Sequence, residues 1–314
     1  YLKALAHGEI TKQYSLLPER FPFREFFSEE NAMKRRTDEE MMERILSVAR
    51  KDDRIRAVWM NGSRANPNAP KDPWQDFDIV YAVTDMDFFT KSDDWVDVFG
   101  PRVIMQSSRN QLSADPAEYE NRYIYLMQFQ DGNRIDLSLI PLSRTEEFFL
   151  SDRMCVPLLD KDGRLPKIPP PTDRDYWVAR PTEREFACCC NEFYWVSTYV
   201  AKGLWRNEIS YAHAMLDGPV RDQLLKLLSW EAGIRTDFSV SVGKCGKYLN
   251  RYLPPEDWTI YCRTYCTADP KDIKTALFTM QQLFSHVSRI VADALSFPLD
   301  TEEARRVLAY LQGE

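Results

Sequence analysis

A proline-rich segment at residues 165–171, Leu-Pro-Lys-Ile-Pro-Pro-Pro, divides the 314-residue chain into two parts with different periodicity. Before it, short apolar runs with alternating polarity indicate strands, whereas after it the helical spacing of apolar residues dominates. Proline fixes one backbone torsion and lacks an N–H group, so this segment predicts a stiff connector. A chain of this length is also expected to form about two domains.

Composition and charge exclude several classes of protein. The chain is 44% hydrophobic and 28% charged, as is usual for globular proteins. No apolar run approaches the roughly 18 to 20 residues that cross a bilayer. A net charge of -7 has the wrong sign for a protein that follows a nucleic-acid backbone mainly by charge. We therefore expect no membrane and no nucleic-acid partner, and small ligands that are cationic or metal-bound.

The seven cysteines and the N-terminal sequence bear on the cellular compartment. The first residues lack the basic start, apolar centre and cleavage site of a secretory signal peptide. The cysteine spacing does not match the paired ligands of a zinc site, so the thiols are expected to be structural or incidental. The sequence therefore predicts a cytoplasmic protein.

The first chemical signal is a tight turn that ends a short apolar strand, predicted at residues 55–60. A helix predicted at residues 38–50 precedes this strand, because Thr37 and Glu40 form a capping box before an apolar stripe. The turn reads Asn61-Gly62-Ser63-Arg64. Its glycine allows the backbone to come close to a ligand.

Three aspartates in predicted strands define the candidate site. Asp76 and Asp78 begin a strand at residues 76–83, and because side chains alternate they project from the same face. Asp136 lies in the otherwise apolar second strand of a hairpin predicted at residues 123–140. Three carboxylates facing one cleft would have raised pKa values or bind a cation, and oxygen-only ligands suit magnesium. The alternative is that Asp76 and Asp78 are solvated and that a base such as Arg134 pairs with Asp136.

This pattern of Gly62-Ser63, Asp76-x-Asp78 and a downstream Asp136 resembles the signature of the nucleotidyltransferase superfamily, to which polymerase-beta-like enzymes belong. Longer stretches resemble the aminoglycoside 6-adenylyltransferases, the streptomycin adenylyltransferase family. The resemblance runs from about Met33 to about Tyr265 and then weakens. The stretches that carry it are residues 53–64, 125–137, 190–195 and 202–206.

The resemblance implies an α+β fold, in which a polymerase-beta-like nucleotidyltransferase domain with a mixed sheet is followed by an α-helical bundle domain. In the helical part, a capping box at Thr182 and Glu185 opens a helix predicted at residues 183–202. Two further helices are predicted, one from residue 209 to 230 that Gly233 stops and a last one from 272 to 295. The expected divisions are an N-terminal extension of unknown role at 1–32, the catalytic domain at 33–164, a linker at 165–172 and the helical domain at 173–314.

The resemblance also implies the reaction: AMP is transferred from ATP to a hydroxyl group of a streptomycin-like antibiotic (6-O-adenylylation), which confers resistance. Two magnesium ions would be held by the catalytic residues Asp76, Asp78 and Asp136, and Asp136 would also take the proton of the acceptor hydroxyl. The residues expected to bind ATP are Gly62 and Ser63, whose turn would hold the triphosphate, Arg64, which would neutralise it, and Lys202.

The acceptor site is expected on the helix that starts at residue 183. Glu185 and Glu192 lie two turns apart on one face of it, next to Trp195, and carboxylates suit a cationic sugar. The expected partners are ATP and an aminoglycoside, with the protein a monomer or a homodimer. Two alternatives remain: a non-catalytic or regulatory binding protein with this fold, as in toxin and antitoxin pairs, and an adenylyltransferase with another small-molecule or RNA acceptor.

Overall fold

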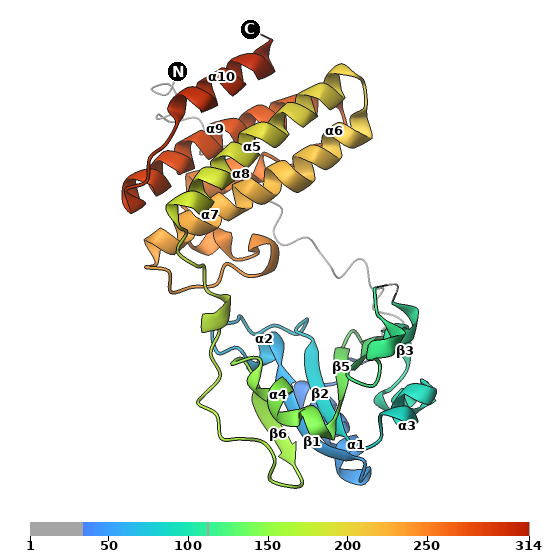
Figure 1. Ribbon diagram of the computed structural model, residues 1–314. Helices are drawn as coiled ribbons and strands as arrows, with labels where there is room; N and C mark the ends of the chain where they lie inside the picture. Colours follow the sequence, from blue (N-terminus) through green and yellow to red (C-terminus); the bar gives the residue numbers. More distant parts are fainter. Residues whose placement is uncertain (1–33, 112, 314) are drawn as a thin grey trace. The chain divides into compact units, whose positions relative to one another are not determined.

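The computed structural model describes residues 34–111 and 113–313 (Figure 1). The chain divides into two compact units, the first ending at Thr172 and the second beginning at Asp173. The predicted N-terminal extension, residues 1–32, lies outside the described residues.

The first unit is built on a six-stranded sheet with the strand order β3-β4-β5-β2-β1-β6. Strands β2 and β5 pair in parallel, whereas the other neighbours pair antiparallel, so the sheet is mixed as predicted. The predicted strands are confirmed, and β6 was not expected. The strand bounds are β1 Ile55–Asn61, β2 Phe77–Val83, β3 Arg102–Ser107, β4 Tyr123–Phe129, β5 Arg134–Pro141 and β6 Val156–Asp160.

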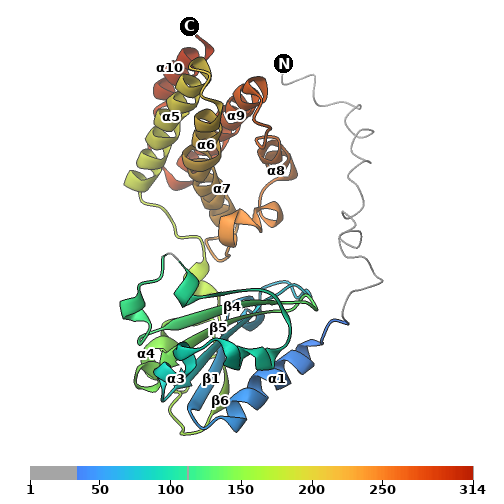
Figure 2. The ribbon, with the colours of Figure 1, turned by 90° about the vertical axis from the view of Figure 1, so that its right-hand side faces the viewer.

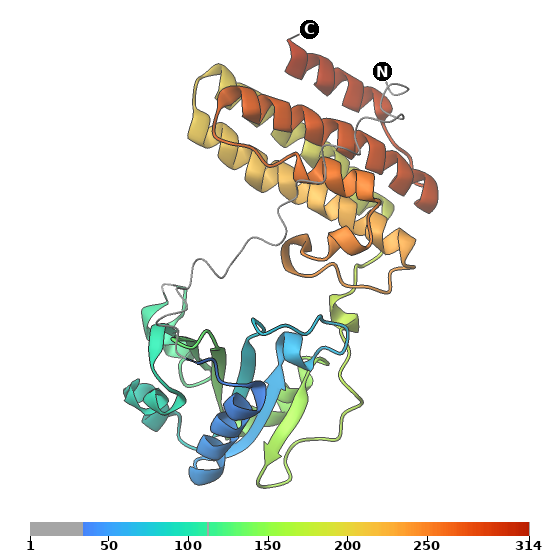
Figure 3. The same cartoon turned by 180° about the vertical axis from the view of Figure 1, so that it is seen from behind.

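Helices cover both faces of this sheet. On one face, apolar residues of α1 (Asp38–Lys51) pack with those of α3 (Met86–Lys91) and the 3-10 helix η3 (Asp94–Phe99) over strand residues such as Phe77. On the other face, Phe149 of α4 (Thr145–Leu150) packs edge-on against Trp59, with ring centroids 5.5 Å apart. Figures 1 and 3 view the sheet from opposite sides, and show α4 in front in one and α1 in front in the other.

The predicted capping box of α1 is present, with the Thr37 side chain accepting from the Glu40 amide. The stretch between β2 and β3 forms two separate helices, α3 and η3.

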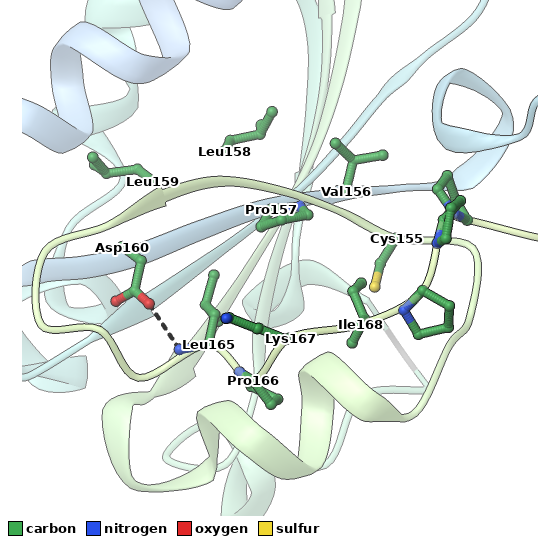
Figure 4. A pocket seen from close by; sticks show the side chains of 13 residues that line it. Cys155, Val156, Pro157, Leu158, Leu159, Asp160, Leu165, Pro166, Lys167 and Ile168 are labelled. Carbon is green, nitrogen blue, oxygen red and sulfur yellow. Dashed lines mark hydrogen bonds between the residues drawn. The ribbon is translucent and has the colours of Figure 1, made fainter.

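The proline-rich segment 165–171 belongs to the first unit and lies along β6. The Asp160 carboxylate accepts a hydrogen bond of 2.8 Å from the Leu165 amide, which turns the chain back beside the strand. Together the strand and the segment line a cavity of about 730 Å³, with Cys155 and Ile168 among its walls (Figure 4). The segment is thus packed on the sheet domain over much of its length.

The second unit is helical throughout its described residues, 173–313. Figures 1 and 2 show α5, α6, α7 and α9 side by side as a bundle. At its centre, Phe193 of α5 stacks on Phe284 of α9 with ring centroids 3.7 Å apart. The bounds are α5 Glu183–Trp205, α6 Ile209–Met215, α7 Arg221–Arg235, α8 Pro255–Cys262, α9 Pro270–Leu295 and α10 Thr301–Gln312.

Three expectations for this unit were wrong. The helix predicted at residues 209–230 is interrupted by a π-helical turn, Leu216–Val220, because Pro219 has no N–H to continue the α-helical ladder. Gly233 does not stop it: the helix runs to Arg235, and a Cβ at Gly233 would lie 2.6 Å from Cδ1 of Phe238. In addition, α10 follows the helix that was expected to be the last.

Candidate functional site

The pairing of β2 with β5 brings the three predicted carboxylates together. Asp78 and Asp136 are direct partners in the parallel register, and Asp76 lies just before β2. Their neighbours Phe77 and Ile135 are buried in the core on the opposite face. Because successive side chains alternate, Asp78 and Asp136 project from the same face, next to each other.

These carboxylates hold more negative charge than the surrounding bases neutralise. The pKa of Asp78 is raised to about 7, first by burial and then by the negative charges of Asp136 and Asp76, against the opposing effect of Arg134 and Arg64. The guanidinium of Arg134 donates from Nε and Nη2 to the two oxygens of Asp136, at 2.7 and 2.8 Å. Its Nε is also 3.7 Å from Oδ2 of Asp76.

The donor set fits a divalent cation, although a finished metal site is not present. Within residues 34–111 and 113–313, no three His, Cys, Asp or Glu side chains are grouped so that they could hold a metal ion together. Carboxylate oxygens are nevertheless the ligands that magnesium prefers, and the charged form of Asp78 is disfavoured by burial and by the neighbouring carboxylates. A cation at Asp78 and Asp136 would stabilise the charged carboxylates if Arg134 released Asp136.

The turn after β1 approaches the carboxylates closely. Asn61 is the register partner of Asp78, so Gly62 begins the short helix α2 (Gly62–Ala65) beside it. Gly62 has a φ of +72°, and a Cβ there would lie 2.5 Å from Cγ of Asp78 and still closer to Oδ2. Only glycine is compatible with both the torsion and the space. Ser63 follows as the second residue of α2.

Arg64 is not placed as the sequence analysis expected. Its guanidinium lies over the ring of Phe77, 3.8 Å from the centroid, and therefore on the face of the sheet opposite to Asp78. Nε and Nη2 donate to the backbone carbonyl of Gln75, at 3.1 and 2.9 Å, and Nη1 donates to Asp38 at 2.6 Å. All three nitrogens are engaged, so the structure does not show a guanidinium free for phosphate.

The remaining candidates belong to α5. Glu185 has a capping role: its carboxylate accepts from the Thr182 amide and hydroxyl, at 2.8 and 2.9 Å, and these bonds lower its pKa. Glu192 and Lys202 are exposed, and Trp195 is 59% exposed with its Nε1 donating to the Tyr199 hydroxyl at 2.7 Å. Helical spacing puts Glu192, Trp195 and Lys202 on one side of α5.

Comparison with known proteins assigns the family. The family model described as streptomycin adenylyltransferase matches residues 35–313. The chain belongs to the streptomycin adenylyltransferase family. The match continues well beyond Tyr265, where the resemblance seen in the sequence weakens. Membership makes the protein an enzyme, a nucleotidyltransferase, as predicted.

Individual relatives agree with the assignment to the streptomycin adenylyltransferases. An aminoglycoside 6-adenylyltransferase of Bacillus subtilis (strain 168) is 41% identical over 263 residues, 83% of this chain and 92% of the relative. One of Campylobacter jejuni is 42% identical over 262 residues, 83% of this chain and 90% of the relative. A crystal structure of an aminoglycoside 6-adenyltransferase from Bacillus subtilis covers 88% of this chain and 98% of its own, with 37% identity and a TM-score of 0.43.

Among the helices of residues 34–111 and 113–313, none has both the length and the apolar character needed to span a bilayer.

Proposed function

We propose that this protein transfers AMP from ATP to a hydroxyl group of a streptomycin-like aminoglycoside, at the 6 position, and so confers resistance to the antibiotic. The observation that carries the proposal is the register pair Asp78 and Asp136, beside the Gly62 turn, in a chain of this family. Neighbouring carboxylates on rigid strands are what metal-assisted phosphoryl chemistry requires of a protein.

In the proposed reaction, the acceptor oxygen bonds to the α-phosphorus while the bond to the β-phosphate breaks and pyrophosphate leaves. The proton of the acceptor hydroxyl goes to Asp136, a role that contributes roughly 10² to 10⁴ in rate. Asp76, Asp78 and Asp136 would hold two magnesium ions, which supply charge stabilisation at the phosphorus when bound.

The proposed substrate-binding residues follow from the charges and hydrogen-bonding groups that they offer. Gly62 and Ser63 have backbone amides at the start of a turn, next to the carboxylates, and amides in such turns bind phosphate. Lys202 is a proposed ligand of the triphosphate because its ammonium group is exposed. For the acceptor, Glu192 would attract a guanidinium or ammonium group and Trp195 would cover a sugar face. Glu185 is the weaker acceptor candidate, because the helix cap already uses its carboxylate.

The test combines donor and acceptor. Purified protein is incubated with magnesium, each of the four nucleoside triphosphates and a panel of aminoglycosides, and the products are analysed by mass spectrometry. We expect a mass gain of one AMP on streptomycin-like compounds with ATP, and none with Asp136→Asn protein. The absence of an adduct on every compound would contradict the proposal and favour a binding function.

A further inference from the structure

We infer that Arg64 and Gln75 are positioning residues that lock the Gly62-Ser63 turn to the strand carrying Asp76 and Asp78. The inference rests on the proposed function, since it concerns how the phosphate-binding turn is held relative to the catalytic carboxylates. Arg64 thereby has a positioning role instead of neutralising phosphate. Gln75, which no sequence pattern singled out, has a positioning role as well.

The two residues bond across the ends of one loop. Residues 66–76 connect α2 to β2, and Gln75 immediately precedes Asp76. The backbone carbonyl of Gln75 accepts both hydrogen bonds from Arg64. In return, Nε2 of Gln75 donates to the backbone carbonyl of Ser63 at 3.1 Å. The turn and the start of the strand are therefore joined by three bonds, none of which uses a catalytic side chain.

Both side chains are shielded from water, which makes these bonds effective constraints. The Arg64 side chain is 8% exposed and Gln75 is 8% exposed. Bonds to a charged donor are stronger than neutral ones, and leaving a buried partner unsatisfied is costly. The planar guanidinium gives a fixed fork that a lysine ammonium cannot reproduce. Phe77 below the fork and Asp38 beyond it hold the guanidinium in place.

The position of the turn matters because its neighbour is a catalytic carboxylate. Gly62 is already at the limit of approach to Asp78, as the overlap of a Cβ with Oδ2 shows. A shift of the turn by about 1 Å would displace bound phosphate from the carboxylates, and errors of that size cost about 10²-fold in rate. We call the three hydrogen bonds that join Arg64 to Gln75 and Gln75 to Ser63 the clamp. Loss of the clamp should therefore lower kcat more than it weakens ATP binding.

The test compares Arg64→Gln, Arg64→Lys and Gln75→Met with Arg54→Gln as the matched control. Arg54 also pairs with a carboxylate, Asp52, and lies over an aromatic ring, that of Phe88, but it flanks the opposite end of β1. We expect kcat to fall at least tenfold in all three clamp variants and less than twofold in the control. We expect affinity for α,β-methylene-ATP to fall less than kcat, and the double variant Arg64→Gln, Gln75→Met to be no worse than the poorer single one.

Three results would overturn the inference while leaving the proposed function intact. Full turnover in Arg64→Lys, with loss of nucleotide affinity in Arg64→Gln, would show that only the charge matters. A wild-type kcat in Gln75→Met would show that Gln75 has no positioning role. A third readout does not need turnover: amide hydrogen exchange of residues 62–75 should quicken in Arg64→Gln and Gln75→Met but not in Arg54→Gln. Unchanged exchange would refute the clamp, whereas failure of wild-type protein to form any adduct would refute the proposed function instead.

Discussion

Gly62 leaves no room for a Cβ, because Oδ2 of Asp78 occupies the place where that atom would be. The glycine also has a φ of +72°. The turn after β1 therefore packs directly against the Asp78 side chain of β2.

Gly62→Ala should lower turnover at least a hundredfold, since either Asp78 or the turn has to move. Stability should fall by roughly 1 to 3 kcal/mol from the strained torsion and the overlap. Gly163→Ala is the matched control: Gly163 has a φ of +65° with nothing within 4 Å of the added Cβ, so it shares the torsional cost alone. Kinetics and thermal unfolding of both variants check this, and equal activity in both would exclude the steric explanation.

Asp78→Asn should abolish transfer and stabilise the metal-free protein above neutral pH. The pKa of Asp78 is raised from 3.8 to about 7, so its favourable contribution is complete below pH 3.8 and is lost as the pH rises through 7. Asparagine does not titrate, and a shift of about three pKa units predicts that the variant gains on the order of 4 kcal/mol over the wild type between pH 4 and pH 8. Urea unfolding at both pH values measures this difference. A difference in the free energy of unfolding that stays constant with pH would mean that the pKa of Asp78 is not raised in the folded protein.

Asp136→Asn should lower kcat at least a hundredfold, because it removes a proposed metal ligand and the proposed base together. The loss should persist at high pH, since hydroxide replaces a missing base but not a metal ligand. A pH series of kcat with excess magnesium provides the measurement. Full recovery at pH 9 to 10 would leave Asp136 a base only.

Arg134→Met should tighten binding of manganese in the absence of ATP, because both oxygens of Asp136 are engaged by Arg134. An increase of at least fivefold in affinity is expected by calorimetry. The same titration of Arg144→Met is the control, as Arg144 makes a similar fork to Glu147 outside the site. Unchanged affinity would mean that Arg134 does not compete with the cation.

Lys202→Ala should raise the KM for ATP several-fold with a smaller fall in kcat, as expected for a group that binds ground and transition states alike. Lys271→Ala, which removes an exposed lysine at the start of α9, should leave both constants unchanged. Initial rates over a range of ATP concentrations give both constants. An unaltered KM in Lys202→Ala would contradict the proposal that Lys202 binds ATP.

Local patterns singled out the three aspartates of the candidate site, but they did not predict how these residues come together. The period of two placed Asp76 and Asp78 on one face, and the apolar hairpin strand marked Asp136 as unusual. That β2 pairs with β5 is a long-range choice that no local pattern encodes, although it is what joins Asp78 to Asp136. Arg64 was misplaced for a related reason: adjacency to Gly62 in sequence does not say to which face of the sheet a side chain turns.

Other differences had signals that the sequence does contain. Pro219 marked the interruption between α6 and α7. Asp300 caps α10 by accepting from the amides of Glu302 and Glu303, a pattern readable from the residues alone. Gln75 is different, since a buried glutamine before a strand has no distinguishing pattern until its partner, the Ser63 carbonyl, is known.

The joined ends of the connection between α2 and β2 bear on how its length can vary. Because Arg64 and Gln75 hold the two ends together, the separation of the ends does not depend on the length of the chain between them. Lengthening a flexible loop costs only about 0.6 kcal/mol for each doubling. Residues added beside an exposed position such as Asn68 should therefore alter the surface that the loop presents while the turn and the carboxylates keep their places.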